Sequence, residues 1–87
     1  MSPLQTADQP LVRQVMAVVA QTLGRPLDEV GPDSRQGELE GWDSLGQLNL
    51  VMELEARFAV SLTTDEVLRM RSIGEIVGVI KERLDGS

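Results

Sequence analysis

The sequence predicts an all-α fold, a small right-handed up-down four-helix bundle with three main helices, a short third helix and a long loop between the first two. Apolar residues recur at spacings of three and four, which is the period of a buried helix face. Hydrophobic residues make up 41% of the chain but aromatic residues only 2%, and this suits packed helices better than a β-sandwich. With 87 residues, the chain has room for one core. We therefore expect a single domain over residues 1–87, with its core at about 8–84.

The first helix is predicted from Asp8, which can cap it, and Pro10 is tolerated in its first turn. Gly24 and Pro26 end it. Its apolar stripe consists of Val12, Val15, Met16, Val19 and Leu23.

Residues 24–43 carry too many glycines and prolines for a regular element, so a long loop is expected there. Leu27, Val30 and Leu39 are candidates to anchor this loop to the core. Loops of this length in compact domains tend to be functional. The loop ends at Trp42 and Asp43.

The second helix is expected from Ser44 to about Ala59. Thr63 with Glu66 three residues later predicts a capping box that opens a short third helix.

A second capping box, made by Ser72 and Glu75, predicts the fourth helix. Gly74 and Gly78 lie inside this helix and indicate a close helix contact. The expected buried stripe is Ile73, Ile76, Val77, Ile80 and Leu84.

Composition excludes several classes of function. The formal net charge of −6 repels nucleic acid phosphates and anionic lipid. The chain has no cysteine and no histidine, so it lacks a thiolate nucleophile, a sulfur-rich metal site and the usual general base. Its N-terminus has no signal-peptide pattern, and no apolar run is long enough to span a bilayer. We expect a cytoplasmic monomer without catalytic residues or a metal, which binds neither nucleic acid nor membrane.

Ser44 is, by its local sequence, a good helix N-cap. Gln47 stands where it could return a hydrogen bond, and such a cap contributes about 1 kcal/mol. Asp43 adds favourable charge beside the helix N-terminus. Local chemistry alone therefore favours a structural role for the serine.

The second helix carries apolar residues on two sides. One side holds Leu50, Val51, Leu54 and Phe58, and we expect it to face the other helices. The nearly opposite side holds Leu45, Leu48 and Met52, continued by Ala56 and Ala59. Two alternatives are open for this second side, which is either a docking face for partner proteins or a second buried face in a small bundle.

The stretch "GWDSLGQLNLVMELEARFAVSLTTDEV", residues 41–67, resembles the signature region of acyl carrier and peptidyl carrier proteins of the discrete bacterial type. It has Asp-Ser-Leu at the start of the second helix, then Leu-Val-Met-x-Leu-Glu, a phenylalanine and a short acidic third helix. The arrangement covers about residues 8–84. The resemblance implies that Ser44, flanked by Asp43 and Leu45, receives 4'-phosphopantetheine from coenzyme A through a dedicated transferase that uses magnesium.

The resemblance further implies a carrier rather than an enzyme. In a chain without cysteine, the prosthetic arm would supply one thiol that carries acyl or aminoacyl groups as thioesters. The implied partners are a phosphopantetheinyl transferase, an acyl- or aminoacyl-loading ligase and a downstream transferase or synthase. We expect these enzymes to dock on Leu45, Leu48, Met52, Glu53 and Ala56.

The chain departs from fatty-acid-synthesis carriers at two positions. Those carriers usually have an acidic residue directly after Asp-Ser-Leu and another three positions on, where this chain has Gly46 and Asn49. Docking should then depend more on apolar contacts and less on salt concentration. The run resembles carriers of specialised polyketide, nonribosomal peptide, fatty-acid-like or aminoacyl-transfer pathways. The rival hypothesis is an unmodified helical protein–protein interaction module in which Ser44 is only a cap.

Overall fold

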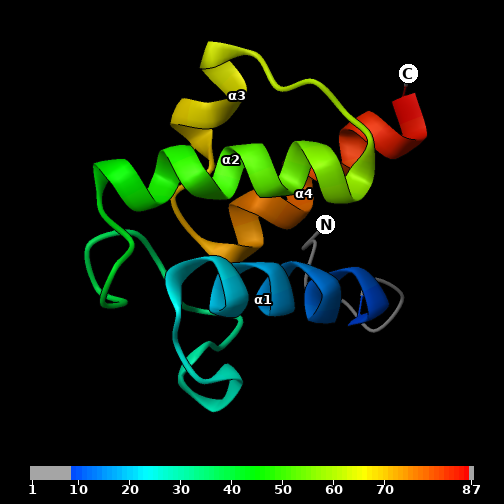
Figure 1. Cartoon of the computed structure of the whole chain (residues 1–87). Coiled ribbons are helices and arrows are strands. Elements are labelled where there is room, and N and C mark those ends of the chain that lie inside the picture. Colours follow the sequence, from blue (N-terminus) through cyan, green and yellow to red (C-terminus); the bar gives the residue numbers. More distant parts are fainter. Residues whose placement is uncertain (1–8, 87) are drawn as a thin grey trace.

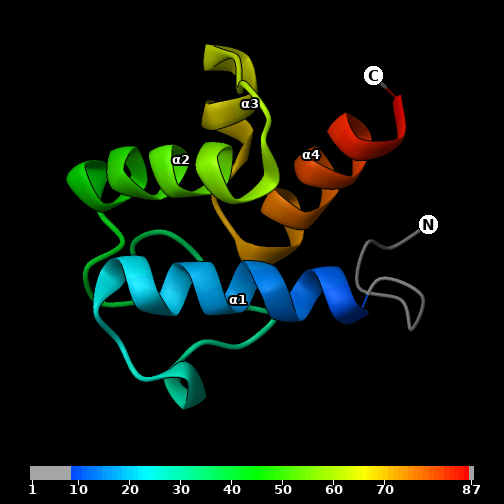
Figure 2. The ribbon, with the colours of Figure 1, turned by 45° about the vertical axis from the view of Figure 1, so that its right-hand side comes forward.

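The computed structural model describes residues 9–86. Four α-helices and one short 3-10 helix follow one another along the chain: α1 (Gln9–Leu23), η2 (Leu27–Glu29), α2 (Ser44–Phe58), α3 (Thr64–Arg69) and α4 (Ile73–Gly86). Helices α1 and α2 lie side by side and run in opposite directions, with α3 beyond α2 and α4 crossing behind them (Figures 1 and 2). The predicted all-α bundle with a short third helix and a long first loop is confirmed.

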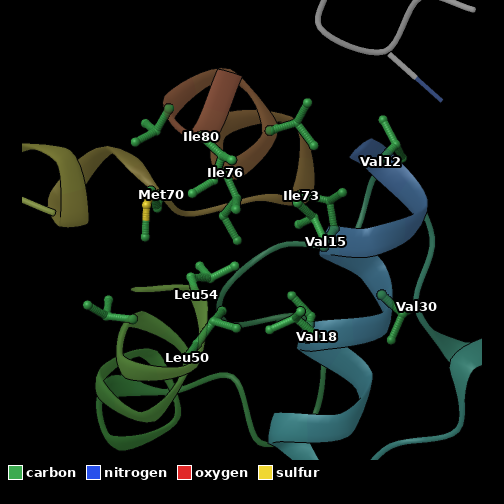
Figure 3. Close-up of a cluster of buried hydrophobic side chains, with 14 of the residues drawn as sticks. Val12, Val15, Val18, Val30, Leu50, Leu54, Met70, Ile73, Ile76 and Ile80 are labelled. Carbon is green, nitrogen blue, oxygen red and sulfur yellow. The ribbon is translucent and has the colours of Figure 1, made fainter. Parts of the chain in front are cut away.

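Aliphatic side chains from all three long helices form the core (Figure 3). Helix α1 contributes mainly valines, α2 contributes leucines and α4 contributes isoleucines, in agreement with the aromatic-poor composition. The predicted stripes are buried at most positions, although Met16, Leu23 and Phe58 are only partly buried. The fully buried aliphatic side chains are Val12, Val15, Val19, Leu50, Leu54, Met70, Ile73, Ile76, Val77, Val79 and Ile80.

Several expectations about individual residues were wrong. Leu84 is 52% exposed, because it lies in the last turn of α4, beyond the part of that helix that packs on the core. Leu27 is 55% exposed in η2, whereas Val30 is buried and Leu39 packs against the core as predicted. No atom outside its own helix lies within 4 Å of the position that a Cβ would take on Gly78, so this glycine marks no close helix contact.

The expected cap of the first helix, Asp8, lies outside the described residues.

Backbone hydrogen bonds join the long loop to the connection between α3 and α4. The N–H of Gln36 donates to the carbonyl of Arg71 at 2.7 Å, and the N–H of Ile73 donates to the carbonyl of Ser34 at 3.0 Å. Near the end of the loop, the N–H of Gly37 donates to the carbonyl of Trp42 at 3.1 Å. The loop therefore has a defined path, and it brings a buried Trp42 to the start of α2.

The predicted capping box of α3 is confirmed. Thr63 Oγ1 accepts from the N–H of Glu66 at 3.2 Å, and Glu66 Oε1 accepts from the N–H of Thr63 at 2.9 Å. Arg83 of α4 also contacts the Glu66 carboxylate, at 2.8 and 2.6 Å. These hydrogen bonds, the Arg83 bonds foremost, lower the pKa of Glu66 to about 2. One carboxylate thus caps α3 and ties it to α4.

The cap of α4 is only partly as predicted. Ser72 Oγ accepts from the N–H of Glu75 at 3.2 Å, which confirms the cap. The Glu75 carboxylate accepts from the Ser72 hydroxyl, also at 3.2 Å, instead of from the backbone N–H that a reciprocal capping box requires.

Within residues 9–86, no helix combines the length and the hydropathy that a membrane span needs.

Candidate functional site

Ser44 is the first residue of α2, and its side chain is exposed at the point where the loop enters the helix. The helix cap is Asp43, whose Oδ1 accepts from the N–H of Gly46 at 2.9 Å. The expectation that Ser44 itself caps the helix was therefore wrong by one position. Across residues 9–86, no hydrogen bond involves the Ser44 hydroxyl, so this group is available for chemistry.

The sequence predicts that Gln47 returns a hydrogen bond to the helix cap. The structure shows that it does not, because its side chain is buried. Its Oε1 accepts from Trp42 Nε1 at 2.7 Å. Its Nε2 donates to the carbonyls of Met70 at 2.9 Å and Val67 at 3.2 Å. One amide therefore joins the end of the loop, the first turn of α2 and the end of α3. We refer to this set of contacts as the Gln47 clamp.

A signal for the Gln47 clamp was present in the sequence. Gln47 stands three, four and seven residues before Leu50, Val51 and Leu54, so it falls on the predicted core face of α2. A polar side chain on such a face must find hydrogen-bond partners inside the protein.

Gly46 is buried, because the loop at Gly41 lies against the first turn of α2. A Cβ on Gly46 would collide with the carbonyl oxygen of Gly41 and would approach Leu23 Cδ2 to 3.1 Å. From the sequence alone, the lack of an acidic residue at this position indicates a missing docking charge. The structure adds a packing reason, because no side chain fits between α2 and the loop.

The second apolar side of α2 is a surface. Leu45 is 68% exposed, Leu48 59% and Met52 60%. Glu53 and Ala56 are exposed beside them. The alternative that both apolar sides are core is thereby excluded, and Ser44 adjoins one end of an apolar strip along the helix.

The start of α2 suits a bound anion. The backbone N–H groups of Ser44 and Leu45 donate to no other group in the part of the chain that the structure describes, and the first turn of the helix holds no acidic side chain. Free N–H groups at a helix N-terminus, together with the helix dipole, stabilise a phosphate-type group. The arrangement therefore fits a phosphodiester on the Ser44 hydroxyl. Within residues 9–86, no group of three or more histidine, cysteine or acidic residues could hold a metal ion.

An exposed serine hydroxyl at the N-terminus of the second helix, beside an apolar helix face in a small helical bundle, defines a carrier domain. Comparison with known proteins agrees, since residues 13–80 match the family model described as phosphopantetheine attachment site. An acyl carrier protein of Rickettsia bellii (strain RML369-C) is 33% identical over 70 residues, which cover 80% of this chain and 81% of that protein. The chain belongs to the acyl carrier protein family.

Other acyl carrier proteins are similar to a comparable degree. That of Exiguobacterium sibiricum is 30% identical over 79 residues, which cover 91% of this chain and 99% of the relative. That of Helicobacter hepaticus is 34% identical over 67 residues, covering 77% of this chain and 88% of the relative. Family membership makes the chain a carrier of acyl groups on covalently attached 4'-phosphopantetheine, and not an enzyme. Its partners include a phosphopantetheinyl transferase and synthase or transferase enzymes.

Proposed function

We propose that Ser44 is the residue that holds 4'-phosphopantetheine. The observation that carries this proposal is the free, exposed Ser44 hydroxyl at the first position of α2, where Asp43 performs the capping. Two other serines are engaged, because Ser34 Oγ accepts from the N–H of Gly31 at 2.9 Å and Ser72 caps α4. Ser61 is exposed, but it lies in the loop after α2, without helix N–H groups beside it.

The residues around Ser44 then have separate roles in the carrier. The N-terminal amides of α2 stabilise the charge of the phosphodiester, and Asp43 fixes the first turn that presents them. When bound, the arm supplies a thiol that forms thioesters with the cargo. Tethering keeps that thioester at a high effective concentration for any enzyme docked on the domain.

The docking face that we propose for partner enzymes consists of Leu45, Leu48, Met52, Glu53 and Ala56. Its apolar members are exposed and follow one another along α2 from Ser44. Methionine adapts to differently shaped surfaces, which suits a face that must bind a transferase, a loading ligase and a downstream synthase in turn. Glu53 contributes a charge at the edge of the strip.

For the pathway, we propose a specialised route that uses acyl or aminoacyl thioesters, such as polyketide, nonribosomal peptide, fatty-acid-like or aminoacyl-transfer biosynthesis. The support is the pair Gly46 and Asn49, which replaces two acidic positions of fatty-acid-synthesis carriers. We further infer a cytoplasmic location, because the arm is donated by coenzyme A.

The attachment site is tested by intact mass spectrometry after incubation with coenzyme A, magnesium and a broad-specificity phosphopantetheinyl transferase. Wild type is expected to gain the mass of one arm and Ser44→Ala to gain none. Ser61→Ala, which removes another exposed serine hydroxyl, is the matched control and should be modified like wild type. Modification of Ser44→Ala, or no modification of wild type by several competent transferases, would refute the assignment.

The docking face is tested with Leu48→Glu, which places a charge in the middle of the apolar strip. Burying that charge under a partner is costly, so kcat/KM of the transferase should fall about tenfold or more. Leu84→Glu is the matched control, since Leu84 is similarly exposed at 52% against 59% but lies on α4. Equal loss in both variants, or a normal rate with Leu48→Glu, would show that this face does not bind the transferase.

A further inference from the structure

A hollow opens beside Ser44, between the first turn of α2, the long loop and the end of α3. Its lining residues are Gln36, Ser44, Gln47, Val67, Leu68 and Arg71. The wall contains both polar and apolar groups, namely the guanidinium of Arg71, the side-chain amides of the two glutamines and the aliphatic side chains of Val67 and Leu68. Because Ser44 is part of this wall, any group attached to its hydroxyl begins at the hollow.

Arg71 has a defined position in that wall. Its carbonyl accepts from the N–H of Gln36 at 2.7 Å, and its Nε donates to the carbonyl of Leu68 at 3.1 Å. The preceding residue, Met70, is bound to α2 through the Gln47 clamp. Both the loop and α2 thus hold the backbone that carries the guanidinium.

The positive charge of Arg71 has no carboxylate partner within residues 9–86. Arg25, Arg69 and Arg83 each form an ion pair with a glutamate, with closest contacts of 2.6, 3.4 and 2.6 Å. Other arginines among the described residues also lack an ion pair, but Arg71 is the one that lines the same hollow as Ser44. The planar fork of arginine is well suited to phosphate oxygens.

We infer that this hollow receives the first part of the prosthetic arm, and that Arg71 pairs with the phosphodiester on Ser44. The inference rests on the proposed role of Ser44. In phosphopantetheine, the phosphodiester is followed by a methylene, a carbon bearing two methyl groups, a hydroxyl-bearing carbon and then the amides. Val67 and Leu68 offer apolar contact to the methyl groups, and the side chain of Gln36 offers hydrogen bonds to an amide. The N–H groups at the start of α2 share the negative charge with Arg71.

The inference is tested by NMR on the isotope-labelled protein before and after modification. Nuclear Overhauser effects are measured between the methyl groups of the arm and those of Val67 and Leu68, together with the shift of the Arg71 Nε–H signal. Three proteins are compared: wild type, Arg71→Gln and the control Arg57→Gln. Arg57 is an exposed arginine in the last turn of α2, far along the helix from Ser44.

In wild type and Arg57→Gln, the arm methyl groups should give Overhauser effects to Val67 and Leu68, and attachment should shift the Arg71 signal in wild type. In Arg71→Gln these effects should weaken about threefold, the order expected from loss of an exposed charge pair. Shift changes confined to residues 43–45 in fully modified wild type, or undiminished effects in Arg71→Gln, would overturn the inference. Intact mass is checked first, so that failure to attach the arm identifies a failure of the Ser44 assignment itself.

Discussion

Replacing Gly46 with alanine is expected to destabilise the protein by roughly 2 kcal/mol. In a helix interior, alanine is normally favoured over glycine by up to about 1 kcal/mol. At this position the new Cβ would collide with the carbonyl oxygen of Gly41, which is backbone and cannot move aside as a flexible side chain could. Overpacking that forces a backbone shift typically costs about 1–3 kcal/mol and outweighs the gain in propensity. Chemical denaturation of apo-protein measures the difference.

Gly78→Ala provides the matched control for this substitution. Gly78 is also inside a helix, and its would-be Cβ meets no atom outside that helix within 4 Å. This variant should be more stable than wild type by about 0.5–1 kcal/mol. Equal effects of the two alanines, in sign and size, would contradict the steric explanation.

The same contact bears on how this chain differs from fatty-acid-synthesis carriers. Introducing the acidic residue that those carriers have, by Gly46→Asp, would put a side chain under the loop instead of on the docking face. The absent charge is thus linked to the path of residues 37–42, which approach the helix closely. An acidic residue could instead be introduced by Asn49→Asp, because Asn49 is exposed on α2, whereas a side chain on Gly46 would meet the loop at Gly41.

The helices were predictable because their signals are local. Apolar periodicity in α1 and α4 and the cap at Thr63 each depend on residues within one or two turns. The start of α2 was also placed correctly, but the cap was assigned to Ser44 instead of Asp43. Both residue types cap helices well, and only the backbone conformation at Asp43, with φ −111° and ψ −164°, decides between them.

Part of the candidate site was predictable because it lies within one helix. The role of Ser44 and the exposed side of α2 can be inferred from the sequence of that helix and its resemblance to a family, whereas the hollow beside Ser44 is formed by three segments. Arg71 is distant in sequence from Gln36 and Ser44, and it meets them only through the pairing of the loop with the α3–α4 connection. No periodicity or cap encodes such a long-range arrangement, so Arg71 was not identified from the sequence.

Gln47→Leu should be at least as destabilising as Gly46→Ala, at about 2–4 kcal/mol, although leucine has a similar size and is more apolar. The substitution leaves Trp42 Nε1 without its partner at 2.7 Å in a side chain that is 1% exposed. It also removes the donor to the carbonyl of Met70, whereas the carbonyl of Val67 keeps the N–H of Met70 as a donor at 3.1 Å. Each buried group left unsatisfied costs about 1–3 kcal/mol, and the apolar gain of leucine offsets part of this sum.

The control for this variant is Gln14→Leu, which alters an exposed glutamine of α1 and should change stability by no more than about 0.5 kcal/mol. A double-mutant cycle with Trp42→Phe then isolates one bond of the Gln47 clamp. Because phenylalanine has no N–H to leave unsatisfied, the two substitutions together should cost less than the sum of their separate effects. Strict additivity would mean that the Trp42–Gln47 hydrogen bond does not stabilise the start of α2.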